Sequence, residues 1–158
     1  MSKTTIIAEP GKQEVTVSRI FNAPPERVFK AAIDPKAIPE WWGPRSLTTE
    51  VESLEPKPAG KWRIVQTDPS GNVYGFHGVY HAVVPPKEIV RTFEYEGTPG
   101  HVVLETSILE NLGGKTKLTI QSVFQSVADR DEMAAAGMEQ GILDSHERLD
   151  EFLAKSET

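Results

Sequence analysis

Two histidines four residues apart are the first candidates for chemistry in this chain. His77 and His81 lie in the segment FHGVYHAV, and imidazoles at this spacing share one face of a helix, where they can bind a metal ion. The segment instead alternates aromatic and β-branched residues in the manner of a strand. Four strand residues span about 13 Å, which is too far for two ligands of one ion. We therefore expect two polar side chains on an outer sheet face and no metal site.

Arg91 is the second candidate. In the segment EIVRTFEY, every second residue lies on the same face of a strand, and Arg91 shares its face with Ile89, Phe93 and Tyr95. The guanidinium of Arg91 therefore faces inward if those apolar side chains do. A buried charge needs a partner. A ligand carboxylate could supply that partner; alternatively, the side chain reaches the sheet edge along its apolar stem.

The segment EWWGPRSL raises a different question, because it suits neither a long helix nor a strand. Trp41 and Trp42 are adjacent and are followed by Gly43 and Pro44. Adjacent side chains in a helical turn point about 100° apart, so at most one of the two can be fully buried in a given pocket. Either one tryptophan plugs the open end of the curved sheet while the other packs against the neighbouring loops, or Trp42 lines the entrance of a ligand cavity with the Gly-Pro pair as a stiff lip. The two interpretations are compatible.

Motifs for phosphate binding and nucleophilic catalysis are not complete in this sequence. Gly114-Lys115-Thr116 resembles the end of a phosphate-binding loop, but the first glycine of that motif would stand at position 109, which is leucine. A strand is predicted after it, so no helix N-terminus would be available for a phosphate. We predict a hairpin turn there. The chain also has neither a G-x-S-x-G nor a G-x-G-x-x-G motif, and we expect no cofactor.

Composition narrows the class of protein. Seventeen Lys and Arg against 23 Asp and Glu give a net charge of −6, which disfavours binding to nucleic acids and to anionic membranes. Without cysteine there are no disulfides and no thiolate ligands. The amino terminus lacks the apolar run of a secretory signal, so we expect a cytoplasmic protein. Its length fits a single domain over residues 1–158, of which 1–12 are expected to be flexible.

Hydrophobic spacing and turn residues predict the order of the elements. A strand comes first, then two short helices, then six strands with short connections, and finally one long helix that begins with Asp129 and Glu132 as a capping box. The predicted strands are 14–21, 46–55, 61–67, 73–84, 88–96, 101–110 and 116–124, and the predicted helices are 25–33, 36–42 and 129–154.

These elements predict an α+β fold. A seven-stranded antiparallel sheet needs a cover for its apolar face, and the long C-terminal helix with the two short helices after the first strand is the material available. We expect the sheet to curve around the long helix. A curved sheet that grips one helix leaves a cavity between the two.

Three motifs occur in this order along the chain: A-P-x-E-x-V-F at the start of the first helix, the WWGP turn, and the Pro-Pro pair before a strand. Together they resemble the SRPBCC, or START-like, superfamily, and within it the proteins related to the carboxy-terminal domain of the activator of the ninety-kilodalton heat-shock chaperone's ATPase. The resemblance implies a helix-grip fold with an internal apolar cavity, but no particular reaction. Many relatives have a Gly-Trp pair where this chain has Gly141-Ile142, which affects the shape of the pocket.

The leading hypothesis is that the chain binds a small, hydrophobic or amphipathic molecule between its last helix and its sheet. A row of aromatic residues around Gly78 suits a concave floor, because glycine permits close approach, and core packing alone would explain the same row. The predicted ligand-binding residues are Trp42, Trp62, Phe76, Tyr80, Arg91, Phe93, Leu104, Met138 and Ile142.

Two other classes of function stay open. The first is a cyclase-like or hydrolase-like enzyme that uses polar groups such as Arg91, His77 or Glu94 in the cavity. The sequence offers no convincing acid–base pair for it. The second is a co-chaperone or other protein-interaction module, with the chaperone as a partner. A homodimer is compatible with the sequence as well.

Overall fold

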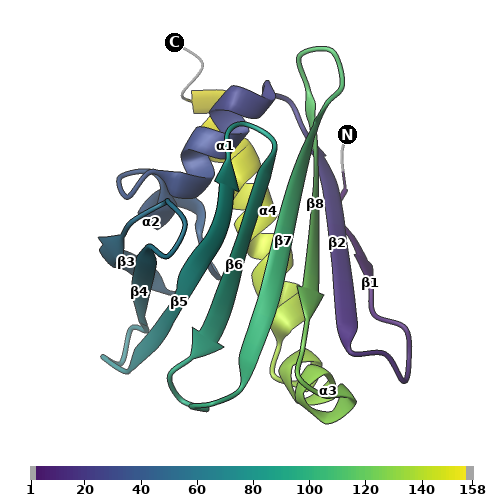
Figure 1. Cartoon of the computed structure of the whole chain (residues 1–158). Helices are drawn as coiled ribbons and strands as arrows, with labels where there is room; N and C mark the ends of the chain where they lie inside the picture. The colour runs from purple at the N-terminus through teal and green to yellow at the C-terminus, as the bar shows by residue number, and fades with distance from the viewer. Residues whose placement is uncertain (1–2, 156–158) are drawn as a thin grey trace.

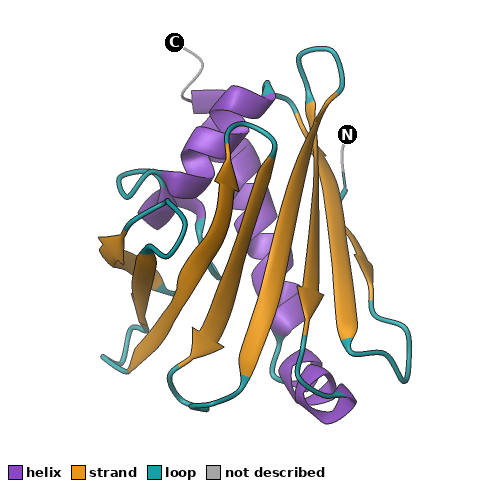
Figure 2. Cartoon of the chain, in the orientation of Figure 1, coloured by secondary structure: helices purple, strands orange, loops and turns teal. Residues whose placement is uncertain are grey.

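A curved antiparallel sheet crossed on one face by the C-terminal helix makes up the structure (Figure 1). The computed structural model describes residues 3–155. Figure 2 shows α4 running diagonally behind the strands, with α1 beside it at one end of the sheet. In chain order the elements are β1 Thr5–Ile7, β2 Glu14–Phe21, α1 Pro25–Ile33, α2 Ile38–Trp41, β3 Thr48–Leu54, β4 Lys61–Thr67, β5 Val73–Val84, β6 Glu88–Tyr95, β7 Val102–Asn111, β8 Thr116–Val123, α3 Val127–Ala135 and α4 Met138–Lys155.

The sheet is a meander that the amino-terminal strands complete. Its order is β1-β2-β8-β7-β6-β5-β4-β3, and all neighbouring strands are antiparallel. The α+β class with a single antiparallel sheet and a C-terminal helix is therefore confirmed. The two short helices after the first long strand are also present.

The sheet has eight strands in the described range, not the seven that were predicted. The additional strand is β1, in which Thr5 pairs with Ser18 and Ile7 with Thr16. It lies within the segment 1–12 that was expected to be flexible; residues 1–2 of that segment fall outside the description. Three residues are too few to show an alternation, so the sequence pattern could not reveal this strand.

The predicted single helix over 129–154 is wrong, because two helices occupy this region. Gly137 has a φ of +91° and follows Ala136, the residue that caps the carboxy-terminal end of α3. Glycine adopts this left-handed conformation without steric cost, which makes it the common residue just past a helix end. The amino-terminal cap of α3 is Ser126, whose side chain accepts a hydrogen bond from the amide of Asp129. Asp129 is therefore not the cap residue that was predicted.

The core lies between α1, α4 and the inner face of the sheet. Leu149 and Leu153 of α4 belong to the same buried cluster as Phe21 of β2, Ile64 of β4 and Phe29 of α1. A second, smaller cluster joins residues of β2 and β7 to Phe124, and Met138 and Ile142 from the start of α4 pack against it. The first turns of α4 are thus less deeply packed than its carboxy-terminal half.

Candidate functional site

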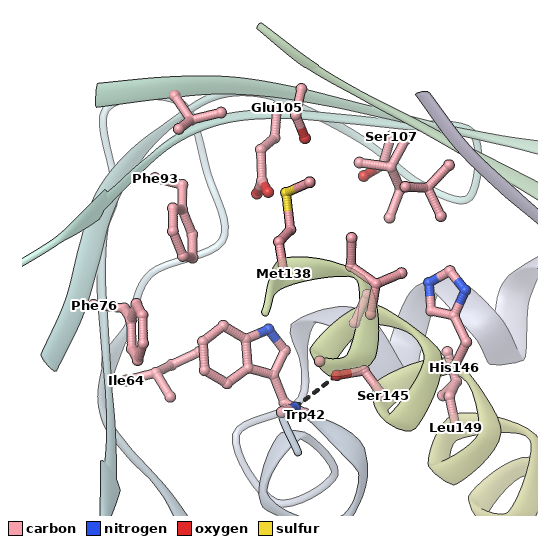
Figure 3. A pocket seen from close by; sticks show the side chains of 18 of the residues that line it. Trp42, Ile64, Phe76, Phe93, Glu105, Ser107, Met138, Ser145, His146 and Leu149 are labelled. Carbon is pink, nitrogen blue, oxygen red and sulfur yellow. Dashed lines mark hydrogen bonds between the residues drawn. The ribbon is translucent and has the colours of Figure 1, made fainter. Parts of the chain in front are cut away.

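A cavity of about 390 Å³ lies between α4 and the inner face of the sheet. This volume falls within the range of pockets that bind small molecules. Figure 3 shows side chains from the sheet, from the WWGP turn and from α4 converging on it. Most of the lining is apolar, and the polar residues come mainly from the middle strands of the sheet.

The structure brings seven of the nine predicted site residues to this cavity, and two lie elsewhere. Trp62 is 1% exposed, and its indole Nε1 donates to the carbonyl oxygen of Thr92 at 3.1 Å, so it belongs to the core. Leu104 is 43% exposed and does not line the cavity. The seven that line it are Trp42, Phe76, Tyr80, Arg91, Phe93, Met138 and Ile142.

Of the two explanations for the aromatic row around Gly78, a concave cavity floor and core packing, the structure supports core packing at Gly78 itself. A β-carbon at this position would lie 1.9 Å from the carbonyl oxygen of Thr92 and 2.7 Å from Nε1 of Trp62. The missing side chain therefore makes room for the Trp62 indole, which crosses Gly78 to reach β6. The close approach is part of the core packing.

An aromatic wall forms one side of the cavity. Trp42 meets Phe76 edge to face with 5.3 Å between the ring centroids, and Phe76 meets Phe93 at 5.5 Å. Trp41 also lines the cavity, but its Nε1 donates to the carbonyl oxygen of Ala31 at 3.0 Å, which holds it against α1. Trp42 thus lies on the cavity wall beside Phe76 (Figure 3), whereas the indole of Trp41 is tied to α1.

Side chains of α4 hold the turn that carries Trp42. The amide of Gly43 donates to the hydroxyl of Ser145 at 2.7 Å, drawn as the dashed line in Figure 3. The guanidinium of Arg148 donates to the carbonyl oxygen of Gly43 at 2.9 Å and reaches the carbonyl of Trp42 at 3.3 Å. Because the turn and the helix are joined in this way, the position of Trp42 follows that of α4.

A row of polar side chains crosses the inner face of four neighbouring strands. Tyr80 pairs with Arg91, Arg91 with Glu105, and Glu105 with Ser122. All four line the cavity, and we call them the polar row. In Figure 3 the Glu105 side chain extends from β7 toward Met138 on the opposite wall.

Arg91 is held firmly within the polar row. Its Nε donates to Oε1 of Glu105 at 3.1 Å, and its guanidinium lies 4.2 Å from the ring centroid of Trp62. The partner that a buried arginine requires is therefore a carboxylate of the protein itself. Trp62, although outside the cavity, supports Arg91 from the core by a cation–π contact.

The hydroxyl of Tyr80 is buried and has no hydrogen-bond partner among the described residues. Burial raises its pKa above the usual value, and the neighbouring Arg91 guanidinium opposes that rise, although no hydrogen bond of good geometry joins the two. The hydroxyl is therefore protonated at neutral pH. Tyr80 is therefore a neutral member of the polar row.

Several residues that line the cavity with polar side chains were not predicted from the sequence: Gln66, Glu105, Ser107, Ser122, Ser145 and His146. A signal for Glu105 was available. The inward-facing Arg91 requires a carboxylate as a partner. Glu105 on the neighbouring strand lies on the same face of the sheet and could have been predicted to supply it.

A family model described as Activator of Hsp90 ATPase homolog 1-like protein matches residues 22–154. The chain belongs to this family. The match and the similar solved structures support the SRPBCC, or START-like, superfamily that the motifs indicated. No curated protein matches the chain.

Solved structures of bacterial proteins have the same fold as this member of the family. A protein from Rhodobacter sphaeroides is 26% identical, with a TM-score of 0.89 over 97% of this chain and 99% of that one. A protein from Arthrobacter aurescens is 25% identical, with a TM-score of 0.89 over 98% and 93%. An AHSA1 protein from Silicibacter pomeroyi is 25% identical, with a TM-score of 0.75 over 90% and 98%.

The two histidines of β5 lie away from the cavity in this family member. Nδ1 of His77 is 2.8 Å from Oε2 of Glu96, and its Nε2 is 3.4 Å from Oε1 of Glu94. The guanidinium of Arg63 beside Glu96 holds the pKa of that carboxyl down to about 2, despite an opposing effect of burial. No set of three or more acidic or histidine side chains in residues 3–155 is arranged to hold a metal ion.

His146 is a buried histidine at the opposite end of the cavity from the aromatic wall (Figure 3). It is 5% exposed, its Nδ1 lies 3.1 Å from the hydroxyl of Thr4, and its ring meets Phe21 edge to face at 5.5 Å. Burial, with a smaller contribution from the Arg19 charge, lowers its pKa to about 4. Arg19 in turn pairs with Asp150 of α4 at 2.6 Å. The imidazole is therefore neutral at physiological pH.

This shift predicts a pH dependence of stability. The unfolded chain protonates His146 near pH 6.5, whereas the folded chain resists protonation until about pH 4. More protons bind to the unfolded state in this window, so the free energy of unfolding falls as the pH drops, by about 3 kcal/mol over the whole window. Urea unfolding between these pH values should show this slope, and His146→Gln should flatten it.

His101 provides a matched control for that prediction. It is exposed, and its bond to Asp129 raises its pKa, so its effect on stability has the opposite sign. His101→Gln should therefore leave the fall in stability toward pH 4 intact or steepen it. A slope that survives in the His146 variant would mean that other groups cause the acid sensitivity.

Among the described helices, none combines the length and the apolar character needed to cross a bilayer.

Proposed function

We propose that this protein binds a small, mostly apolar molecule in the cavity between α4 and the sheet. The observation that carries the proposal is the combination of an aromatic wall with a short polar row inside one cavity of about 390 Å³. Ligand pockets typically combine a largely apolar lining with a few placed polar groups. Burial of apolar ligand surface would supply the driving force, at about 25 cal/mol per Å².

The placement of the polar groups favours binding over catalysis. Two groups considered for an enzyme, His77 and Glu94, do not line the cavity. Of the cavity groups, Arg91 and Glu105 are committed to each other, and His146 is neutral near pH 7 with a bond to Thr4. A general acid and base that face each other across a substrate are not formed by these residues. A co-chaperone role rests on the family's name alone.

Native mass spectrometry of the gently purified protein tests the proposal, with solvent extraction to identify whatever is bound. We expect a reproducible adduct whose mass corresponds to a small apolar compound. Tryptophan fluorescence offers a second readout, because Trp41 and Trp42 line the cavity. If the protein is empty and a broad panel of fatty acids, sterols and polyketides leaves the fluorescence unchanged, the proposal is wrong.

A further inference from the structure

We infer that the ligand of this cavity carries no net charge and has a polar, hydrogen-bonding group at the end that meets the polar row. The inference rests on the proposed function and narrows its ligand class. It follows from the charges that the cavity already contains and from the way in which they are partnered.

The ionised side chains that line the cavity are Arg91 and Glu105, one of each sign. Their side chains are only 17% and 21% exposed, and they are joined through Nε and Oε1 at 3.1 Å. The remaining polar lining residues are neutral: hydroxyls, the amides of Gln66, and the imidazole of His146, whose pKa is about 4. The polar row is therefore strongly polar yet has no net charge.

A charged ligand, whether positive or negative, would find no unpaired side chain of opposite charge in this arrangement. A carboxylate placed against Arg91 would come close to Glu105, so the site would contain two negative charges for one positive charge. An ammonium placed against Glu105 would meet Arg91 in the same way. Each case also requires the ligand charge to leave water, which is costly unless the charge is paired.

An uncharged oxygen avoids both costs. A carbonyl oxygen can accept from the guanidinium of Arg91, which uses Nε for Glu105 and has two further nitrogens that donate. A hydroxyl can donate to Glu105, whose second oxygen makes no hydrogen bond with residues 3–155. The ligand carboxylate considered for Arg91 on sequence grounds is therefore replaced by a neutral carbonyl or hydroxyl compound.

Four naphthalene derivatives of matched size test this inference by calorimetry at neutral pH. They are acetylnaphthalene, which is a neutral ketone, together with naphthoate, naphthylmethylammonium and the apolar ethylnaphthalene. We expect the ketone to bind the wild-type protein about tenfold or more tightly than either ion. The charge of each ion would lie close to a cavity side chain of the same sign, Glu105 for naphthoate and Arg91 for naphthylmethylammonium.

Glu105→Gln provides the decisive variant. Glutamine keeps an acceptor for Nε of Arg91 but leaves the arginine charge without a counterion. We expect naphthoate to bind this variant about tenfold or more tightly than it binds the wild-type protein, so that the preference for the ketone over naphthoate falls or reverses. Arg91→Gln should shift the preference toward naphthylmethylammonium instead. Glu110→Gln, on the same strand but not in the cavity, is the matched control and should shift neither.

The outcomes separate the inference from the proposed function. If naphthoate binds the wild-type protein as tightly as the ketone does, or if Glu105→Gln changes no preference in a folded variant, the neutral-ligand inference is overturned while cavity binding stands. If none of the four compounds binds the wild-type protein, the proposed function fails as well. Circular dichroism confirms the fold of each variant before titration.

Discussion

Replacing Gly78 with alanine is expected to lower the free energy of unfolding by about 3 kcal/mol. The added β-carbon would lie 1.9 Å from the backbone oxygen of Thr92, so it would clash with the backbone of β6, which is paired on both sides in the sheet, and not with a flexible side chain. It would also displace the Trp62 indole from its hydrogen bond to the same oxygen. Overpacking and the loss of a buried hydrogen bond therefore act together. Urea unfolding followed by circular dichroism measures the change.

Gly141→Ala is the control for this experiment. Gly141 lies within α4, and a β-carbon there would meet nothing closer than Cγ of Pro44, at 4.0 Å. Alanine is about 1 kcal/mol more favourable than glycine inside a helix, so this variant should be stabilised. The same substitution is thus expected to lower the free energy of unfolding at position 78 and to raise it at position 141. A loss below about 1 kcal/mol in Gly78→Ala would contradict the packing argument.

Turn chemistry and alternation were sufficient to predict most of the fold. The strands at 61–67 and 73–84 and the helix at 25–33 have the predicted bounds, because proline, glycine and aspartate mark their ends. The break at Gly137 was not predicted, since one glycine in a helical pattern is often tolerated. The left-handed φ of Gly137 separates α3 from α4, and hydrophobic spacing along the chain does not report such a local break.

The candidate site was less predictable than the fold, and β7 shows the reason. Both faces of this strand contain apolar residues. Leu104 and Ile108 lie on one face, and Val103 and Leu109 lie on the other. Hydrophobicity therefore could not tell which face is inner, and Leu104 was chosen where Glu105 lines the cavity. On β6 the choice was clear, because Ile89, Arg91 and Phe93 share one face.

Trp62 illustrates a second limit of sequence reasoning. Its orientation toward the inner face was predicted correctly, yet it does not line the cavity. Whether an inward side chain reaches a cavity depends on what covers it, here Arg91 above and Gly78 beside it. Depth within a core is set by contacts between distant strands, which alternation along one strand does not describe.

A larger side chain on α4 that occupies the cavity should strongly weaken ligand binding without lowering the free energy of unfolding. Ile142 lines the cavity and is only partly buried, so Ile142→Trp can direct its larger ring into the open space. Steric exclusion should weaken the binding of acetylnaphthalene by about a hundredfold or more, which is the cost of roughly 3 kcal/mol of lost contact area. The midpoint of urea unfolding should stay the same or rise, because filling a cavity adds apolar contacts.

Leu104→Trp is the matched control, because it adds the same ring at a position that is 43% exposed and outside the cavity. This variant should bind acetylnaphthalene as the wild-type protein does. If Ile142→Trp is folded and binds with unchanged affinity, the ligand does not occupy the space between α4 and the sheet. Loss of binding in the Ile142 variant alone, at unchanged stability, assigns the ligand to the cavity, because the two variants differ only in where the added ring lies.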